Sequence, residues 1–315
     1  MMSFFVYIRG KKMGFRVVFI ENKVHMKIKL DNIVIDNGER ESWIPINDVN
    51  MIVVDNIQTT ITGRTLCLLA QNNVGLIICN QEHLPIGYYS SYDNHSRISK
   101  FIGFQIQRNK EFYDKLWKDI VQSKLENQAQ FLEKYEFSQD VINSIRAFKV
   151  EVVDGDITNR EAHGAKIYFN EMMGESFSRG NDEILLNSGL DYGYTIIRSY
   201  IARLCVGYGL NSQLGIHHKN EYNRFNLVDD IMEPVRPIVD LFAYKLLKNE
   251  QFFKAHHRAD LVNLLNHKIL YKNKKMYLCN MLEDYVSDIA AFIAGKRSKI
   301  IFPEVNNYIG EENEV

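Results

Sequence analysis

The sequence predicts an α+β protein in which a small N-terminal β-sandwich-like domain is followed by a larger all-helical domain. Over residues 15–89, apolar residues alternate with polar ones or form short continuous runs, which is typical of strands. From about residue 98 to residue 299 the apolar spacing is almost entirely helical. The stretch YYSSYDNHSR between these regions is polar and without periodicity. The length of 315 residues suits one large domain or two ordinary ones.

Five segments follow from these changes in pattern. They are an N-terminal extension (residues 1–12), a β domain (13–88), a linker (89–97), a helical domain (98–302) and an acidic tail (303–315). Met13 is a candidate start codon, which would make the first segment an addition to the domain that follows it.

Each part of the β domain has its own signal. In KVHMKIKL, four apolar residues alternate with polar ones as in a half-buried strand, and the turn pair Asp31–Asn32 follows it. The runs MIVVD and VGLIICN indicate shorter, more buried strands. Between them, TITGRTLCLLAQNN indicates a helix that begins near Thr60 or Thr62. Strands interrupted by one helix favour a mostly-β domain over a dinucleotide-binding unit.

The helical region opens with SKFIGFQIQRNKEFYDKLWKDIVQSKLENQAQFLEKY, which predicts one long helix. Its basic residues form either a DNA-contacting track or an exposed face of i, i+4 ion pairs, because acidic residues interleave with them. The basic residues are Arg108, Lys110, Lys115, Lys118 and Lys124, and the acidic ones are Glu111, Asp114 and Asp119. Near the other end, SDIAAFIAG indicates a buried final helix.

The charge balance gives weak guidance about partners. The chain has 38 basic and 39 acidic residues and a net charge of −1, which argues mildly against nucleic acid. The tail PEVNNYIGEENEV carries four glutamates and no basic residue. Removing these four negative charges from −1 leaves +3, so a local basic surface is permitted. We expect this tail to be mobile or weakly docked, because it lacks apolar periodicity.

The compartment can be predicted from what the chain contains. Four scattered cysteines without a C-x-x-C pair suggest small buried side chains in a reducing environment: Cys67, Cys79, Cys205 and Cys279. No apolar run approaches the roughly 20 residues that cross a bilayer. The N-terminus also lacks the residue order of a secretory signal. We therefore expect a cytoplasmic protein without a membrane partner.

Two segments carry candidate chemistry, and the first is GDITNREAHGAKIYFNEMMG, residues 155–174. Thr158 and Glu161 fit a capping box, which would make Glu161 a structural residue. Glu161 also opens a helical face that continues through Ala165, Tyr168 and Met172. A carboxylate in that position is either a cap or a functional group.

The second segment, GIHHKNEYNRFNLVDDIMEPVRPIVD, joins two histidines to three acids on one short helix. Asp230 and Glu233 are i, i+3 neighbours, and Asp229 and Glu233 are i, i+4 neighbours. Their mutual repulsion would be relieved by a divalent cation, although the aspartates also suit a helix N-terminus. Carboxylates with one neutral imidazole favour Mg²⁺ or Mn²⁺ over zinc, and such a site would serve phosphoryl chemistry.

These two segments, together with NSGLDYGYTIIRSYIARLCVGYGLNSQL and LWKDIVQSKLENQ, resemble the CRISPR-associated spacer integrase, in particular its type II branch. The resemblance runs from about Gly14 to Pro303 and leaves residues 1–12 outside the family pattern. This family is the catalytic subunit of the complex that acquires spacers in antiviral defence. Its fold, a β domain followed by a helical catalytic domain, agrees with the fold class given above.

The resemblance also implies a mechanism and a set of site residues. The family's metal ligands match Glu161, His218 and Glu233, and Asp230 matches a supporting acidic position. His217 is an additional histidine beside His218, so an assignment shifted by one residue stays open. With Mg²⁺ or Mn²⁺, the site would join the 3′-OH ends of short foreign DNA to a CRISPR repeat by transesterification. Candidate contacts to DNA phosphates near the site are Arg160, Lys219, Arg224 and Arg236.

The partners implied are duplex DNA with 3′ overhangs, CRISPR repeat DNA, a second copy of the chain bound through the β domain, and a dimer of a small ferredoxin-like protein. A type II effector and an accessory adaptation protein are further candidate partners. Two alternatives stay open: a metal-dependent nuclease of branched or single-stranded DNA without integration, and a non-catalytic DNA-binding scaffold.

Overall fold

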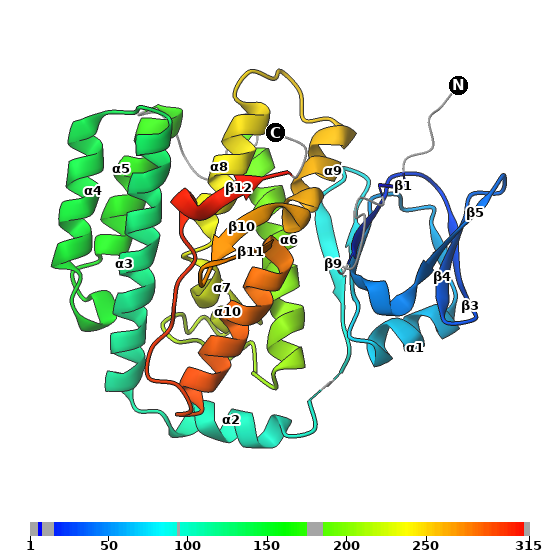
Figure 1. The fold of residues 1–315 in the computed structure, drawn as a ribbon, viewed down its shortest axis with the longest axis horizontal. Coiled ribbons are helices and arrows are strands. Elements are labelled where there is room, and N and C mark those ends of the chain that lie inside the picture. The colour runs from blue at the N-terminus through cyan, green and yellow to red at the C-terminus, as the bar shows by residue number, and fades with distance from the viewer. Residues whose placement is uncertain (1–5, 8–15, 93–94, 175–184, 312–315) are drawn as a thin grey trace.

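A computed structural model of the chain describes residues 6–7, 16–92, 95–174 and 185–311. A strand-rich N-terminal unit packs beside a larger helical unit (Figure 1). The predicted α+β fold class is confirmed. The predicted segment boundaries stay predictions. The strands of the first unit end at Tyr89, the next helix begins at Ile98, and part of the expected linker lies outside the described residues.

The N-terminal unit contains two sheets. The five-stranded sheet has the order β1-β2-β6-β8-β9, and its strands span Val6–Tyr7, Arg16–Ile20, Val49–Val54, Gly75–Cys79 and Pro85–Tyr89. The four-stranded sheet has the order β5-β4-β3-β7, with strands Glu41–Pro45, Asn32–Asp36, His25–Lys29 and Thr60–Ile61. Strands β2, β6 and β8 are parallel neighbours, and the outer strands β1 and β9 are antiparallel to them.

The five-stranded sheet is apolar on both faces, which explains the continuous apolar runs in its strands. Val18, Ile52 and Leu76 belong to the core shared with the four-stranded sheet. The alternate residues, Phe19 and Met51 among them, belong to the core of the helical unit. The same sheet therefore joins the two units through a buried layer.

Helix α1, Gly63–Gln71, covers one edge of this unit and begins where the sequence predicted. The Thr62 hydroxyl accepts a hydrogen bond from the Thr65 N–H at 3.2 Å and caps the helix. Cys67 on this helix is exposed, whereas Cys79, Cys205 and Cys279 are buried. The expectation that all four cysteines are buried is therefore wrong for Cys67.

The predicted long helix is two helices. Helix α2 ends at Gln107 and α3 begins at Lys110, because the Asn109 side chain accepts from the Phe112 N–H at 2.9 Å and starts a new helix. The 25-residue α3 runs through the helical unit, and other helices pack around it (Figure 1). The helices of this unit are α2 (Ile98–Gln107), α3 (Lys110–Lys134), α4 (Gln139–Glu151), α5 (Arg160–Met173), α6 (Leu185–Gly207), α7 (Asn226–Met232), α8 (Arg236–Leu247), α9 (Ala255–Asn263) and α10 (Leu278–Ile293).

The helical unit also contains a third sheet, so the expectation of an all-helical second domain is wrong. Strand β10, Lys268–Tyr271, lies between β11, Lys274–Tyr277, and β12, Tyr308–Gly310. The residues at the turn, Lys272 and Asn273, both have positive φ, which closes a tight hairpin. The hairpin was missed because its strands are only four residues long.

The C-terminal segment is docked up to Glu311, so the expectation of a mobile or weakly docked tail is wrong for these residues. Val305 is fully buried, and β12 pairs with β10. Its backbone also binds side chains of α3, since the Val305 N–H donates to Asn127 Oδ1 at 3.2 Å and the Asn306 N–H donates to Gln130 Oε1 at 3.0 Å. The buried Val305 side chain thus anchors a segment whose composition is mostly polar.

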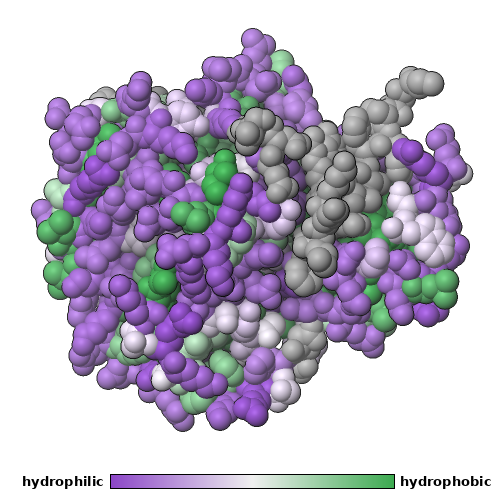
Figure 2. Space-filling model, viewed as in Figure 1, coloured by the Kyte–Doolittle hydropathy of each residue, from purple (hydrophilic) through white to green (hydrophobic). Residues whose placement is uncertain are grey.

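The expected N-terminal extension contributes β1, which pairs with the first strand of the domain (Val6 opposite Ile20). Hydrophilic residues cover most of the visible face of the helical unit, and apolar side chains form scattered patches (Figure 2). Across the described ranges, no helix combines the length and the apolar character needed to cross a membrane.

Candidate active site around Lys124

The first turn of α5 places Glu161 in the site. Asp156 caps this helix by accepting hydrogen bonds from the Arg160 and Glu161 N–H groups, both at 2.9 Å. Three residues with positive φ, Gly155 at 73°, Asp156 at 48° and Asn159 at 54°, shape the turn that makes this possible. The alternative capping box between Thr158 and Glu161 is therefore replaced by Asp156. The Glu161 side chain is directed to α3 instead.

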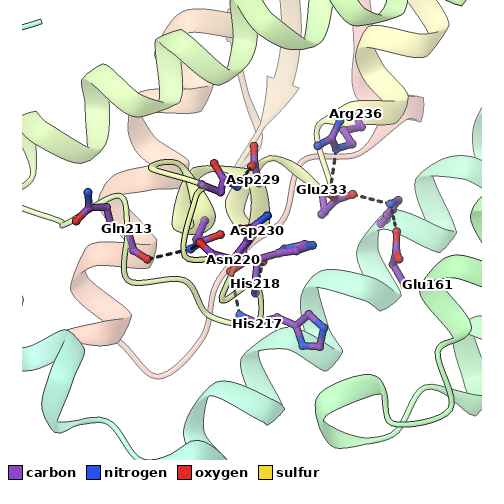
Figure 3. A network of polar contacts seen from close by, with 12 residues as sticks. Glu161, Gln213, His217, His218, Asn220, Asp229, Asp230, Glu233 and Arg236 are labelled. Atoms are coloured by element: carbon purple, nitrogen blue, oxygen red, sulfur yellow. Dashed lines mark hydrogen bonds and ion pairs between the residues drawn. The ribbon is translucent and has the colours of Figure 1, made fainter. Parts of the chain in front are cut away.

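Lys124 of α3 connects the two glutamates. Its ammonium pairs with Glu161 Oε1 and lies 2.5 Å from Glu233 Oε2. The Glu161 and Glu233 side chains point toward one another (Figure 3). The Lys124 side chain is only 8% exposed. Burial by itself would lower the pKa of Lys124, but the charges of Glu233 and Glu161 outweigh burial and raise that pKa.

Glu233 lies at the end of α7, where the chain turns into α8. Pro234 and Pro237 bracket this junction, and Arg236 Nε donates to Glu233 Oε1 at 3.0 Å. Burial would raise the pKa of Glu233, but the charges of Arg236 and Lys124 lower it to about 2. Glu233 Oε2 and the Lys124 ammonium lie 2.5 Å apart and form a buried ion pair, and a hydrogen bond from Lys124 is among the causes that lower the pKa of Glu233.

His218 lies in the loop before α7 and is oriented by Asp230. The Asp230 carboxylate is fully buried and accepts the N–H groups of His217 at 2.9 Å and of His218 at 3.3 Å. Its Oδ1 also lies 2.5 Å from His218 Nδ1. This hydrogen bond raises the pKa of His218, against the opposing effect of partial burial. It occupies Nδ1 and leaves Nε2 available to a ligand.

His217 has a different environment. Its ring stacks on Trp117 of α3 with centroids 4.3 Å apart and planes 5° apart. Burial lowers the pKa of His217. Because His217 is held by packing and His218 by a carboxylate, the geometry favours His218 over His217 as the ligand-binding imidazole.

A groove of about 860 Å³ opens beside this histidine pair. Its lining combines the loop from Gln213 to Asn226 with the start of α3, including Lys110, Tyr113 and Asp114. Lys219 and Arg224 are exposed, and both line the groove. They are the candidate phosphate contacts best placed for an extended ligand.

The other candidate DNA contacts already have partners. Arg236 pairs with Glu233 and lies over the Tyr194 ring, and Arg160 pairs with Glu151 at 3.0 Å. Along α3, Lys110 pairs with Asp114 at 2.5 Å and Lys115 with Glu111 at 2.6 Å. The basic residues of α3 therefore favour the ion-pair interpretation over a free DNA track.

Glu161, His218 and Glu233 have the donor atoms that a divalent ion requires, but these atoms do not surround a common point. Among the described residues, no group of three or more His, Cys, Asp or Glu side chains is arranged to hold a metal. The expected convergence on a common point is therefore not observed, because Lys124 lies between the two glutamates. Two carboxylates and an imidazole nitrogen are nonetheless ligands that Mg²⁺ and Mn²⁺ accept. Glu161 and Glu233 already face one shared cation, the Lys124 ammonium.

The sequence pattern assigned Lys124 either to a DNA-contacting track or to a solvent-exposed face of ion pairs, and its position in the site was missed. The missed signal is its spacing, since Lys124 follows Ile120 by four residues and precedes Leu125, both of which are fully buried. A lysine on a buried helical face requires anionic partners. Asp156 was missed as well, because its capping role depends on a local turn.

Comparison with solved structures shows which known proteins share this fold. A casposase bound to an integration product superposes with a TM-score of 0.75 at 18% identity and covers 96% of both chains. A Cas6-RT-Cas1–Cas2 complex gives a TM-score of 0.71 at 15% identity over 92% of this chain and 36% of that one. At these identities the likeness establishes the fold shared by casposase and Cas1 proteins.

Sequence comparison then identifies the family. The model for CRISPR associated protein Cas1 matches residues 17–270. A CRISPR-associated endonuclease Cas1 of Neisseria meningitidis serogroup C (strain 8013) is 30% identical over 301 residues, covering 93% of this chain and 97% of that protein. The chain therefore belongs to the Cas1 family, as the sequence segments suggested.

Proposed function

We propose that this protein is a divalent-metal-dependent DNA integrase of CRISPR adaptation that joins the 3′-OH ends of short foreign DNA to a CRISPR repeat. The observation that carries the proposal is the pairing of Glu161 and Glu233 about one buried cation, with the oriented His218 nearby at the edge of a groove. Membership of a family whose relatives are named endonucleases, and a fold shared with a DNA-bound casposase, support it.

The reaction is a transesterification. The incoming 3′-hydroxyl loses its proton to solvent as its oxygen forms a new P–O bond with the repeat phosphate. The P–O bond to the leaving 3′-oxygen breaks, and that oxygen takes up a proton. One phosphodiester is exchanged for another, so no external energy source is required.

The chain's own residues would perform three tasks. Glu161, Glu233 and His218 Nε2 would hold Mg²⁺ or Mn²⁺, which would supply Lewis-acid stabilisation of the charge on the phosphate. Asp230 would keep the His218 ring in its orientation and its Nδ1 protonated. Lys219 and Arg224 would contact backbone phosphates along the groove.

The proposed partners are duplex DNA with 3′ overhangs, repeat DNA, a second copy of this chain and a small ferredoxin-like protein dimer. The related complex that contains Cas1 and Cas2 supports the last of these. A type II effector would act with this assembly to select the incoming DNA.

The test is an assay that separates joining from cutting. A labelled duplex with free 3′-OH ends is incubated with a repeat-containing plasmid, the protein, its partner and Mn²⁺. Joined label would support the integrase. Cleavage without joining would favour the nuclease alternative, in which water replaces the 3′-OH, and DNA binding without either reaction would favour the scaffold.

A further inference from the structure

Lys124 lies on a buried face of α3. Val121 and Leu125, its neighbours on the helix, are fully buried, and the lysine side chain itself is 8% exposed. An ammonium at such a position is destabilising unless anions surround it. The two glutamates from α5 and α7 supply this compensation, and they come from segments 72 positions apart in the sequence.

The four charges at the centre of the site cancel. Lys124 and Arg236 carry two positive charges, and Glu161 and Glu233 carry two negative charges. If a divalent ion joined this group while Lys124 stayed in place, two uncompensated positive charges would be added to a largely buried cluster. Repulsion between cations a few ångströms apart is strong where solvent screening is weak.

The interatomic distances also indicate that the ammonium and a divalent ion cannot occupy the site together. The Lys124 ammonium lies 2.5 Å from Glu233 Oε2 and contacts Glu161 Oε1. An ion shared by these two oxygens would lie about 2.0–2.2 Å from each of them. An ion at those distances would overlap the position of the ammonium nitrogen.

We propose that Lys124 is the resident counter-ion of the metal-free site, and that its ammonium and a divalent ion are alternative occupants of the space between Glu161 and Glu233. This inference rests on the metal site proposed above. Lys124 is thus a positioning residue: it keeps the two carboxylates together before the ion arrives, and it must leave them when the ion binds. Because a metal ion must displace the ammonium from the space between the carboxylates, Lys124 lowers the affinity of the site for metal.

The test measures Mn²⁺ binding to the full-length, metal-free protein by calorimetry and by electron paramagnetic resonance of free Mn²⁺. Lys124→Met removes the charge and keeps the length of the side chain. We expect it to bind Mn²⁺ at least about fivefold more tightly than the wild type, the lower end of typical coupling between sites. Its melting temperature in EDTA should fall, and its stabilisation by Mn²⁺ should exceed that of the wild type.

Lys118→Met is the matched control, because Lys118 lies on the same helix and pairs with Asp154 at 3.2 Å, away from the two glutamates. It should leave Mn²⁺ affinity unchanged. If Lys124→Met does not fold, Lys124→Gln keeps a polar side chain and carries the same expectation. Affinity in either folded variant that equals or falls below that of the wild type would overturn the inference.

The two proposals fail in different ways. A wild-type protein that binds no Mn²⁺ at millimolar concentration, with or without DNA, would overturn the metal site and the role of Lys124 together. A wild type that binds Mn²⁺, with unchanged affinity in the Lys124 variants, would overturn only the role of Lys124.

Discussion

The Asp230 carboxylate makes three contacts with the histidine pair: it accepts the backbone N–H groups of His217 and His218 and contacts His218 Nδ1 at 2.5 Å. Asp230 is fully buried, whereas the His218 side chain is 45% exposed. The buried Asp230 carboxylate thus orients the accessible His218 ring. The other ring nitrogen, Nε2, is available to a ligand. The site is prepared by a residue that need not touch the metal itself.

Asp230→Asn should weaken Mn²⁺ binding by about 10–100-fold, because it removes the charge that fixes the ring and its protonated nitrogen. DNA affinity should change little. Titration of Mn²⁺ by electron paramagnetic resonance, with DNA binding measured on the same preparation, checks both. Asp229→Asn is the control, since Asp229 pairs with Arg198 at 2.6 Å instead of with His218. Equal loss in both variants would contradict a specific role for Asp230.

Glu233→Gln should abolish strand transfer and leave DNA binding nearly intact. The change keeps the size of the side chain and removes the charge needed to hold Mg²⁺ or Mn²⁺. It also leaves Arg236 without its anionic partner, so we expect the free energy of unfolding to fall by about 3 kcal/mol. Activity is therefore measured below the midpoint of thermal unfolding.

The control for this variant is Glu126→Gln, which alters a glutamate of α3 that pairs with Lys149 at 2.9 Å. It should retain strand transfer. DNA binding in all variants should fall as salt is raised, since basic residues supply it. Full strand transfer by Glu233→Gln would remove this residue from the site.

Gly164→Ala tests the close packing of α5 on α3. A Cβ at Gly164 would lie 2.2 Å from Leu125 Cδ2, the side chain next to Lys124. Relieving this clash should cost about 1–3 kcal/mol of unfolding free energy. It should also move Glu161, one turn earlier on α5, away from Glu233 and lower Mn²⁺ affinity.

Gly103→Ala is the matched substitution, because no atom lies within 4 Å of a Cβ at that position in α2. It should stabilise the protein by about 0.5–1 kcal/mol and leave Mn²⁺ binding unchanged. Calorimetric melting and Mn²⁺ titration of the two variants give the comparison. A Gly164→Ala protein with wild-type stability would show that Leu125 moves aside freely.

Truncation after Pro303 should damage the protein, contrary to what the acidic composition of the tail suggests. Asn127 donates to Pro234 O at 2.7 Å and to Pro303 O at 2.8 Å, so one side chain of α3 joins the Glu233 turn to the C-terminal segment. Loss of Val305 and β12 should reduce the free energy of unfolding by roughly 2–4 kcal/mol. Denaturant unfolding measures this.

A truncation after Glu311 retains all these contacts and should match the wild type in stability and strand transfer. Wild-type stability after truncation at Pro303 would show that the docked segment contributes nothing to the fold. Normal stability with lost strand transfer would instead indicate a direct role for the segment in the reaction.

Ile86→Lys should dissociate the proposed homodimer. Ile86 of the edge strand β9 is 72% exposed, and Leu84 and Ile78 beside it are 44% and 40% exposed. An exposed apolar edge strand is a pairing surface, and a charge placed there opposes pairing. Sedimentation velocity at micromolar concentration should show a dimer for the wild type and a monomer for the variant.

Ile57→Lys is the control, because Ile57 is 52% exposed in the same unit but lies outside β8 and β9. It should stay dimeric. A wild-type monomer with an intact β unit would contradict the homodimer, and a dimer of Ile86→Lys would place the interface elsewhere.

The sequence by itself determined the fold class, the change from strands to helices and the residues that matter. Periodicity is a local property, so KVHMKIKL and the helical faces could be read without knowing their neighbours. The site residues came from segments that resemble a family, because neither the spacing of Glu161 nor that of the Asp230–Glu233 helix is decisive alone. The local sequence around Glu161 favoured a role in capping the helix together with Thr158.

Only the tertiary structure decided how these residues are partnered. Asp156, and not Thr158, caps α5 through a turn with three positive-φ residues, which alternation and spacing do not encode. In the sequence, Lys124 cannot be distinguished from the other lysines of the basic helix. Its role follows from the packing of α5 and α7 against α3. Val305 and Asn127 likewise join parts of the chain 178 positions apart. Contacts of this kind depend on which faces meet in the folded core, and that information lies in packing and not in any short stretch of sequence.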